Sequence, residues 1–243
     1  MFFFSKKYSI AEIGLLEGGT DCHSHLLWGV DDGVHTAEDA LSCLQLMEQQ
    51  GLKTQWFTPH IMEDVPNKVE HLKLRFAEFE EQYAREESPT GHKIQLHLGA
   101  EYMMDGLFTE LLSQGEPLLT TYDKETLLVE TSTIFPPLNM DSILEQIKAK
   151  GYRPMLAHPE RYLYMKKEDY KALYYKGTLF QLNLASLTGA YGPMERDKAK
   201  WLLENNMYYI YGTDTHRLSQ LKSISQSKCL RSKTADLLLN LKA

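Results

Sequence analysis

The segment Asp21-Cys-His-Ser-His25 stands at the end of a short apolar run near the start of the chain. Side chains alternate along an extended strand, so His23 and His25 point to the same side and can reach one metal ion together. Asp214 and His216 repeat this spacing far away in the sequence. The two pairs therefore predict a fold that brings the ends of distant strands together around a metal site.

Short runs rich in β-branched, aromatic and aliphatic residues recur along the chain between longer segments of helical period. This is the pattern of successive βα units. We expect strands at Gly19–Ser24, Thr54–Pro59, Ile94–Ala100, Thr126–Thr131, Arg153–Ala157, Leu179–Leu184 and Met207–Gly212. Strands that alternate with helices predict a parallel sheet, and about seven of them favour a closed α/β barrel. An open, doubly wound sheet is the alternative, although no glycine-rich nucleotide motif follows any of these runs.

Amphipathic segments separate the expected strands. The segment Thr36–Gln50 carries apolar residues at intervals of three and four, with Thr36 as a suitable N-cap and Gly51 closing it. The other expected helices are Pro66–Glu87, Asp141–Lys150, Lys167–Tyr175 and Pro193–Asn205.

The length of 243 residues and the hydrophobic share of 43% suit one sizeable core. Barrels of roughly 200 to 250 residues commonly form a single domain. No repeat, low-complexity tract or linker divides the sequence. We therefore expect one catalytic domain over residues 1–243, with an N-terminal extension at 1–18 and a helical or mobile tail at 219–243. Within that tail, Ala235–Leu241 has helical character.

The charge balance is acidic, with 26 Lys and Arg against 33 Asp and Glu, a net charge of -7. This balance gives no footprint for nucleic acid or for an anionic membrane surface. No stretch approaches the roughly 20 apolar residues that span a bilayer, and the initial apolar run is too short for a signal peptide. We expect a cytoplasmic protein with no nucleic-acid partner and no direct membrane insertion. The three widely spaced cysteines argue against a disulfide framework and a thiolate zinc site.

Residues of metal-binding type stand at six of the seven expected strand ends, where a βα barrel carries its functional side chains. They are His23, His25, His60, Glu101, Glu130, His158, Asp214 and His216. Imidazoles and carboxylates together suit manganese, iron or zinc. Eight ligands exceed the need of one ion, so two or three divalent ions are implied, and a carboxylate such as Glu130 is suited to bridge them. Asp32 is a further candidate ligand, and Asp31 beside it is the weaker one.

Taken in order, the motifs of this chain resemble those of the PHP superfamily, the polymerase and histidinol phosphatase metallohydrolases. The motifs are Asp21-Cys-His-Ser-His25, Asp31-Asp-Gly33, Thr58-Pro-His60, Gly99-Ala-Glu101, Leu128-Val-Glu130-Thr131, Ala157-His158-Pro-Glu-Arg-Tyr162 and Gly212-Thr-Asp214-Thr-His216. The likeness runs from about Thr20 to about Leu218 and is strongest to the bacterial tyrosine phosphatases of capsular and exopolysaccharide operons. It implies a distorted (β/α)7, TIM-like barrel with the active site at the C-terminal ends of the strands.

The resemblance further implies a trinuclear site of manganese, iron or zinc. Transferred by motif, the ligands of one ion would be His23, His25, Glu130 and Asp214. Those of a second ion would be His60, Glu101, Glu130 and His158, and Asp32 with His216 would serve the third.

The resemblance implies hydrolysis of a phosphate monoester by direct attack of a metal-bound hydroxide, with Asp32 and His216 among the catalytic residues. Arg161 is the candidate clamp for the phosphoryl group, because a guanidinium offers a bidentate fork to phosphate oxygens. The alternative for Arg161 is a surface salt bridge with a residue such as Glu160. Arg217 is a weaker second clamp.

Trp28 stands where the resembled family usually has a proline, in the segment Leu27-Trp28-Gly29. Its indole has two equally weighted interpretations, stacking on an aromatic substrate or packing against the barrel rim.

The substrate that the resemblance implies is the phosphotyrosine tail of a membrane-associated bacterial tyrosine kinase in capsule or exopolysaccharide biosynthesis. Histidinol-phosphate phosphatase is the nearest alternative, and the acidic surface favours it weakly because an acidic phosphopeptide would be repelled. A 3′-exonuclease is disfavoured by the missing basic track. A non-catalytic metal-binding regulator is the alternative from another class, and the full ligand set argues against it.

Overall fold

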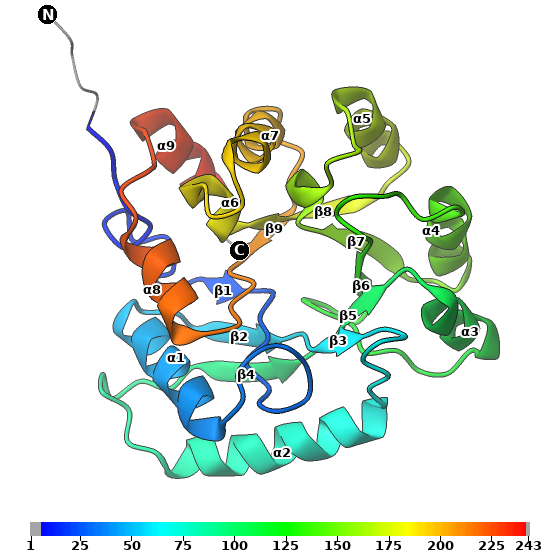
Figure 1. Cartoon of the computed structure of the whole chain (residues 1–243). Coiled ribbons are helices and arrows are strands. Elements are labelled where there is room, and N and C mark those ends of the chain that lie inside the picture. The colour runs from blue at the N-terminus through cyan, green and yellow to red at the C-terminus, as the bar shows by residue number, and fades with distance from the viewer. Residues whose placement is uncertain (1–5, 242–243) are drawn as a thin grey trace, which may run out of the picture.

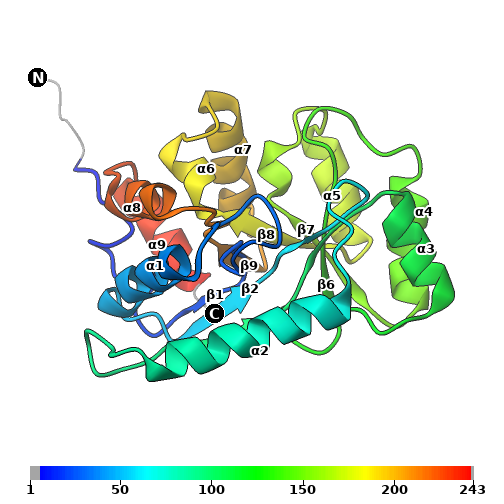
Figure 2. The same cartoon turned by 60° about the horizontal axis from the view of Figure 1, so that its bottom comes forward.

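The computed structural model describes residues 6–241 of the chain. It has an α/β architecture in which short parallel strands form a curled wall and the helices lie outside it (Figures 1 and 2). The strands are β1 (Thr20–Asp21), β2 (Thr54–Phe57), β3 (His60–Ile61), β4 (Gln95–Leu98), β5 (Glu101–Met103), β6 (Thr126–Glu130), β7 (Arg153–Ala157), β8 (Leu179–Asn183) and β9 (Ile210–Gly212).

The strands pair in two groups, in the order β1-β2-β4 and β3-β5-β6-β7-β8-β9, and every pair is parallel. Two of the expected strands are each followed by a further short strand that the sequence did not predict. The run Thr54–Pro59 contains β2, and β3 begins after a break at Pro59, whose ring nitrogen has no hydrogen to donate. The run Ile94–Ala100 contains β4, and β5 begins after a break at Gly99 and Ala100. Backbone bonds continue across the breaks, as Gly99 donates to Phe57 O at 2.8 Å. Each break thus passes the chain from one group of strands to the other.

Backbone hydrogen bonds also join the segment that follows β1 to the one that follows β9. Asp214 N donates to His23 O at 2.8 Å, and His25 N donates to Thr215 O at 2.9 Å. The wall of strands therefore curls far enough for its first and last segments to meet. This contact places the two pairs of candidate ligands side by side.

The helices are α1 (Ala37–Gln49), α2 (Val69–Arg85), α3 (Gly106–Gln114), α4 (Met140–Ala149), α5 (Lys167–Tyr175), α6 (Leu184–Thr188), α7 (Pro193–Glu204), α8 (Leu218–Gln226) and α9 (Ser232–Asn240), with a 3-10 turn η1 at Pro159–Arg161. The five helices expected from the sequence correspond to α1, α2, α4, α5 and α7. Three others, α3, α6 and α8, were not predicted. Helix α3 escapes a pattern search because glycine begins it, whereas the structure shows the Asp105 carboxylate capping it at Phe108 N, 2.9 Å away.

Helix α1 fixes the loop that carries Asp32. Its N-cap Thr36 accepts a hydrogen bond from Asp39 N at 3.1 Å, and it buries Ala40, Leu44 and Met47. Gly51, directly after the C-cap, has φ +79°, the left-handed conformation that glycine adopts without cost.

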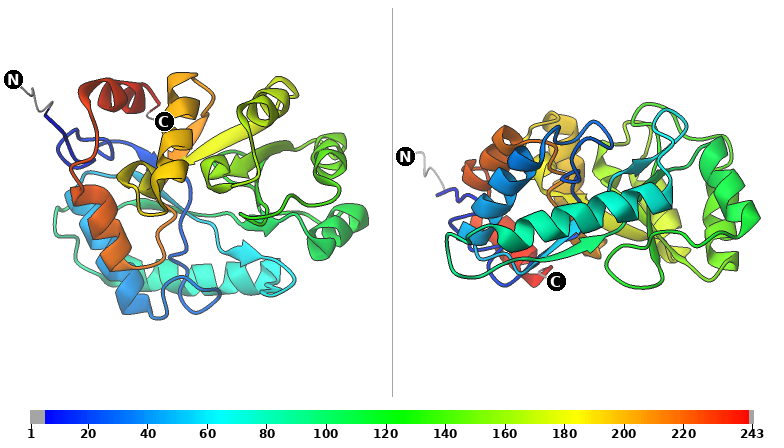
Figure 3. Two further views of the ribbon diagram at one scale, coloured as in Figure 1. Left: turned by 45° about the horizontal axis from the view of Figure 1, so that its top comes forward. Right: turned by 90° about the horizontal axis from the view of Figure 1, so that it is seen from below.

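Residues 219–241 form part of the packed structure. Helix α8 lies beside α1 in both views of Figure 3, and α9 packs against α7. Leu221, Ile224 and Leu238 are buried, and Leu230 pairs with Tyr8 through two backbone hydrogen bonds. Among residues 6–241, no helix combines the length and apolarity needed to cross a bilayer.

The strands enclose a small apolar cluster that is separate from the main core between strands and helices. Its fully buried members are Cys22, Leu128, Met155, Ala157 and Ile210, which come from β6, β7, β9 and the end of β1. The polar centre is built on the residues that follow these strands.

Candidate metal centre

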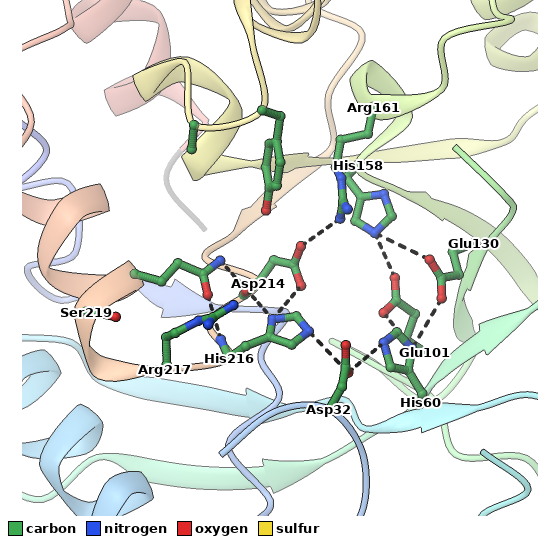
Figure 4. A pocket seen from close by; sticks show the side chains of 13 residues that line it. Asp32, His60, Glu101, Glu130, His158, Arg161, Asp214, His216, Arg217 and Ser219 are labelled. Atoms are coloured by element: carbon green, nitrogen blue, oxygen red, sulfur yellow. Dashed lines mark hydrogen bonds and ion pairs between the residues drawn. The ribbon is translucent and has the colours of Figure 1, made fainter. Parts of the chain in front are cut away.

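The nine predicted metal ligands come together at the carboxyl ends of the strands, and Figure 4 shows those that line the pocket there. His23, His25, Glu101, His158 and Asp214 are at most 1% exposed. Glu130 is 8% exposed, and the remaining three lie nearer the mouth. Buried charges on this scale are tolerated only when they are paired or coordinate metals.

Glu101 occupies the middle of the cluster. Its Oε2 lies 3.2 Å from His23 Nε2, 3.3 Å from His25 Nε2 and 3.3 Å from His60 Nδ1. Its Oε1 lies 3.0 Å from His158 Nε2. One carboxylate thus faces four imidazoles, two from the segment after β1 and one each from β3 and the end of β7, and Glu101 belongs to two of the possible ligand groups.

Glu130 lies to one side of the cluster, 3.2 Å from His60 Nδ1 and 3.8 Å from His158 Nε2. Its carboxylate belongs to a possible ligand group with His60 and Glu101, and to none with His23 or His25. The expectation that Glu130 bridges the ions and joins His23 and His25 stays a prediction, and this geometry places Glu101 rather than Glu130 in a possible ligand group with those two histidines. The register of β5 against β6 places Glu101 deeper, opposite Leu128, while Glu130 pairs with Met103.

Asp214 closes the opposite side of the cluster. Its Oδ1 lies 3.4 Å from both His23 Nε2 and His25 Nε2. The backbone at Asp214 has φ +51° and that at His158 has φ +33°, so two candidate ligands adopt left-handed conformations that are uncommon outside glycine. Strained backbone of this kind concentrates at functional sites.

His60 and His216 form the outer part of the cluster with Asp32. Their Nε2 atoms each lie 3.5 Å from Asp32 Oδ1, and the Asp32 side chain is 72% exposed. Asp214 O accepts a hydrogen bond from His216 Nδ1 at 2.9 Å, which leaves His216 Nε2 free to face the pocket. These three residues and His25 form one possible ligand group.

Asp31 supports the cluster from behind. Its Oδ2 lies 2.9 Å from His25 Nδ1 and accepts from His60 N at 3.1 Å, while Oδ1 accepts from Gly33 N. A carboxylate on Nδ1 directs Nε2 of a histidine toward a metal. The sequence prediction that Asp31 is the weaker ligand candidate agrees with this placement. Gly33 is needed beside it, because a Cβ there would lie 2.1 Å from His25 O.

The donor set fits divalent metal ions. Four overlapping groups of imidazole nitrogens and carboxylate oxygens have ligand atoms within 4.8 Å of one another. His60 Nδ1 lies close to two carboxylates, yet it makes no hydrogen bond with any residue in the described range 6–241. Two ligand atoms of one metal ion lie close to each other in this way, although neither donates a hydrogen bond to the other. The cysteines stand outside these groups, and burial raises the pKa of the Cys22 thiol.

A pocket of about 580 Å³ opens over the cluster. Besides the candidate ligands, the pocket is lined by Arg161, Ala190, Tyr191, Arg217, Ser219 and Gln220. Arg161 donates to Asp214 Oδ2 at 3.1 Å, and its guanidinium covers the Tyr191 ring with the carbon 4.4 Å from the ring centroid. The pocket therefore places guanidinium groups beside a cluster of metal-ligand type.

The alternative pairing of Arg161 with Glu160 is wrong. Glu160 is fully buried and faces away from the pocket, where it accepts hydrogen bonds from Ser186 Oγ and Tyr208 Oη, both at 2.8 Å.

Trp28 does not line this pocket. Its ring packs under the guanidinium of Arg75, whose carbon lies 3.9 Å from the ring centroid, and it contacts the core. Of the two interpretations of Trp28, packing against the rim agrees with the structure. Stacking on a substrate does not, because Arg75 from α2 already occupies a ring face.

A sequence model of one protein family, described as "Capsular polysaccharide synthesis, CpsB/CapC", matches residues 19–234. The chain belongs to this family. The resemblance to tyrosine phosphatases of capsule operons is thereby confirmed. Within the family, the chain is 26% identical over 204 residues to the tyrosine-protein phosphatase YwqE of Bacillus subtilis, covering 82% of this chain and 77% of that protein. It is 24% identical over 202 residues to the putative tyrosine-protein phosphatase CapC of Staphylococcus aureus, covering 82% and 77%.

Solved structures that share the fold include two phosphatases. The metal-dependent tyrosine phosphatase structure described for YwqE of Bacillus subtilis and CpsB of Streptococcus pneumoniae superposes with a TM-score of 0.72 at 24% identity, over 92% of this chain and 95% of that one. The histidinol phosphate phosphatase of Lactococcus lactis, complexed with zinc, histidinol and phosphate, gives a TM-score of 0.50 at 13% identity, over 85% and 90%.

Several residues that shape the site of this CpsB/CapC protein were missed by the sequence analysis. Gln181 and Asn183 touch candidate ligands, and Tyr191 and Ser219 line the pocket. One signal was present, because β8 was the single expected strand whose end carried no metal-binding residue. The end of β8 without a ligand was thus the signal in the sequence, and the role of its amides follows from their partners in the structure.

The charges of this CpsB/CapC centre are strongly coupled. Burial acts to lower the pKa of His23, but the carboxylates of Glu101 and Asp214 outweigh it and raise that pKa to about 9. Burial acts to raise the pKa of Glu101, and the neighbouring imidazoles, His23 foremost, hold it well below its ordinary value. Without metal the carboxylates therefore hold protons on the imidazoles, and an arriving ion must displace them.

This coupling predicts how the stability of the metal-free protein depends on pH. The raised pKa of His23 stabilises the fold fully below its unfolded value of about 6.5, and this contribution is lost as the pH rises toward 9. We expect the melting temperature of chelated protein to fall across this window, because the free energy of unfolding decreases by an amount on the order of 3 kcal/mol. Differential scanning calorimetry in a metal-free buffer series measures it. Protein saturated with Mn²⁺ is the control and should not show the fall, and a flat or rising curve for chelated protein would contradict the prediction.

Proposed function

We propose that this CpsB/CapC protein is a metal-dependent protein-tyrosine phosphatase that hydrolyses phosphate monoesters. One observation carries the proposal: a buried cluster of imidazoles and carboxylates shares a pocket of about 580 Å³ with the guanidinium groups of Arg161 and Arg217. A phosphoryl group needs positive charge on several sides, and this arrangement would supply it from bound ions and from guanidinium groups.

The proposed ligands are the nine predicted residues, and they would hold two or three ions of manganese, iron or zinc. Bound ions of this kind supply Lewis acidity to the non-bridging phosphate oxygens and lower the pKa of water. The possible ligand groups are His23, His25 and Glu101; His23, His158 and Asp214; His60, Glu101 and Glu130; and His25, Asp32, His60 and His216.

The protein side chains of the pocket have separate proposed roles. Arg161 would clamp the phosphoryl group, held in place by Asp214 and the Tyr191 ring. Arg217 lines the same pocket as a second clamp. Asp32 and His216 would orient the reacting groups at the mouth, where their side chains are the more exposed members of the cluster.

The fold supports a finer description as a distorted (β/α)7 barrel that forms a single catalytic domain over residues 1–243. In support, each of the seven expected runs contains a strand, β3 and β5 directly follow two of these runs, and backbone bonds join the segments after the first and the last run. Residues 8–16 and both C-terminal helices contribute buried side chains to the same core.

The proposed substrate is a phosphotyrosine-bearing protein, specifically the phosphorylated tail of a bacterial tyrosine kinase of capsule or exopolysaccharide biosynthesis. The names of the family's curated members, tyrosine-protein phosphatases YwqE and CpsB, support the substrate class. The description of the family as one of capsular polysaccharide synthesis supports the process.

Histidinol phosphate is the second candidate substrate, because the histidinol phosphate phosphatase of Lactococcus lactis shares the fold. A kinetic comparison decides between them. We expect Mn²⁺-loaded protein to hydrolyse a phosphotyrosine peptide with kcat/KM at least about 10-fold above that for histidinol phosphate, a difference of about 1.4 kcal/mol. Chelated protein provides the blank, which should show no turnover. A preference for histidinol phosphate would overturn the substrate, and no turnover of any aryl phosphate would overturn the enzyme.

A further inference from the structure

Strand β8 differs from the other strands that reach the centre, because it contributes none of the nine proposed ligands. Its end carries two amides instead, Gln181 and Asn183, and both are fully buried. Buried amides require hydrogen-bond partners, and the partners of these two include proposed metal ligands.

Gln181 faces His23 from the side opposite the cluster. Its Oε1 lies 3.0 Å from His23 Nδ1 and accepts from the backbone N of His158 at 3.3 Å. Its Nε2 donates to Leu182 O at 2.6 Å, which fixes the orientation of the amide. Because the oxygen end faces His23, Nδ1 must carry the hydrogen, and Nε2 is the nitrogen that can present a lone pair to an ion once its own proton is displaced.

Asn183 contacts Asp214 through the donor end of its amide. Its Oδ1 accepts from Ala185 N at 2.8 Å as the N-cap of α6, so its Nδ2 is the end that faces Asp214. That Nδ2 donates to Asp214 Oδ2 at 2.6 Å and to Tyr191 Oη at 3.1 Å. Asp214 Oδ2 is thereby engaged, and Oδ1 remains directed at the imidazoles 3.4 Å away.

The neighbouring strand leaves room for this arrangement. A Cβ at Gly212 would lie 2.5 Å from His23 Cβ and 2.8 Å from Gln181 Nε2. Only glycine lets β9 approach the Gln181–His23 pair this closely. The local sequence therefore accommodates the contact on both strands.

We propose that Gln181 and Asn183 are positioning residues that hold His23 and Asp214 in the form and direction required to bind metal ions. The inference rests on the proposed metal centre and extends it to a second layer of side chains. Neutral amides suit this task, because the buried carboxylates of Glu101 and Asp214 already lie within the cluster. A further buried carboxylate beside them would add like-charge repulsion.

The test is the binding of Mn²⁺ alone to full-length, metal-free protein. Gln181→Met keeps the side-chain volume but removes the acceptor for His23 Nδ1. We expect it to weaken at least one Mn²⁺ site by about 10- to 100-fold, the usual effect of losing an outer-shell partner. Isothermal titration and elemental analysis give the affinity and the number of ions. Asn183→Ala, measured in the same way, is the second variant in case Gln181→Met does not fold.

Gln55 provides a matched control. It is an equally buried glutamine on a strand, β2, and its Nε2 donates to Ser24 Oγ at 2.9 Å and to Trp56 O at 3.0 Å. Gln55→Met should bind Mn²⁺ with unchanged affinity and stoichiometry. Circular dichroism melting of both variants shows whether each remains folded.

A spectroscopic measurement separates positioning from simple packing. In Zn²⁺-loaded native protein, imidazole nitrogen NMR should show a hydrogen-bonded Nδ1–H at His23, and Gln181→Met should shift that resonance. Native Mn²⁺ affinity in folded Gln181→Met and in Asn183→Ala would overturn the inference. Absence of Mn²⁺ binding by the native protein would instead overturn the metal centre itself, so the two failures are distinguishable.

Discussion

Glu101→Gln is expected to lower kcat/KM for an aryl phosphate by about 10³-fold or more and to reduce the number of ions bound per chain. The substitution keeps the shape of the side chain and removes the charge that faces His23, His25, His60 and His158. Loss of charge stabilisation by metal ions is worth several kcal/mol, and about 4 kcal/mol corresponds to this factor. Elemental analysis and steady-state kinetics on the same preparation measure both effects.

Glu48 offers the matched control for this substitution. It is a glutamate on α1 with 3% exposure, it accepts hydrogen bonds from Tyr83 Oη and from Ser88 Oγ, and it belongs to none of the possible ligand groups. Glu48→Gln should retain the native ion count and turnover. If Glu101→Gln kept both as well, the central position of Glu101 would have no role in the reaction, and the proposed centre would have to be rebuilt around Glu130.

The sequence predicted the wall of parallel strands because each strand is a compact run of β-forming residues bounded by helical segments. It could not predict that a separate short strand follows β2 after Pro59 and another follows β4 after Gly99, since this depends on which neighbour each strand pairs with. Helix α3 was missed for a related reason. Its start is determined by the Asp105 cap rather than by any apolar period.

The proposed ligands were predictable because strand ends of a curled parallel sheet meet in space. The position that each ligand occupies within the cluster was not predictable. Whether Glu101 or Glu130 lies in the middle depends on the β5–β6 register, which one-dimensional spacing does not contain. The same holds for Trp28, whose ring is covered by Arg75 from a helix distant in sequence, and for the amides of β8, whose importance appears only once their partners are known.

Arg161→Lys is expected to lower kcat/KM for phosphotyrosine peptides and for aryl phosphates by about 10²-fold while the bound ions remain. Removal of one charge-stabilising donor typically costs 10²- to 10³-fold in rate. Lysine keeps a positive charge near Asp214 but lacks the planar fork that grips two phosphate oxygens and lies flat over Tyr191.

Arg75→Lys is the control, because Arg75 also stacks on an aromatic ring, that of Trp28, outside the pocket. Steady-state kinetics and ion analysis of both variants decide the matter. Native turnover in Arg161→Lys, or an equal fall in kcat/KM in both variants, would show that the guanidinium of Arg161 does not bind the phosphoryl group. Loss of ions from Arg161→Lys would show that the main role of Arg161 is to hold Asp214.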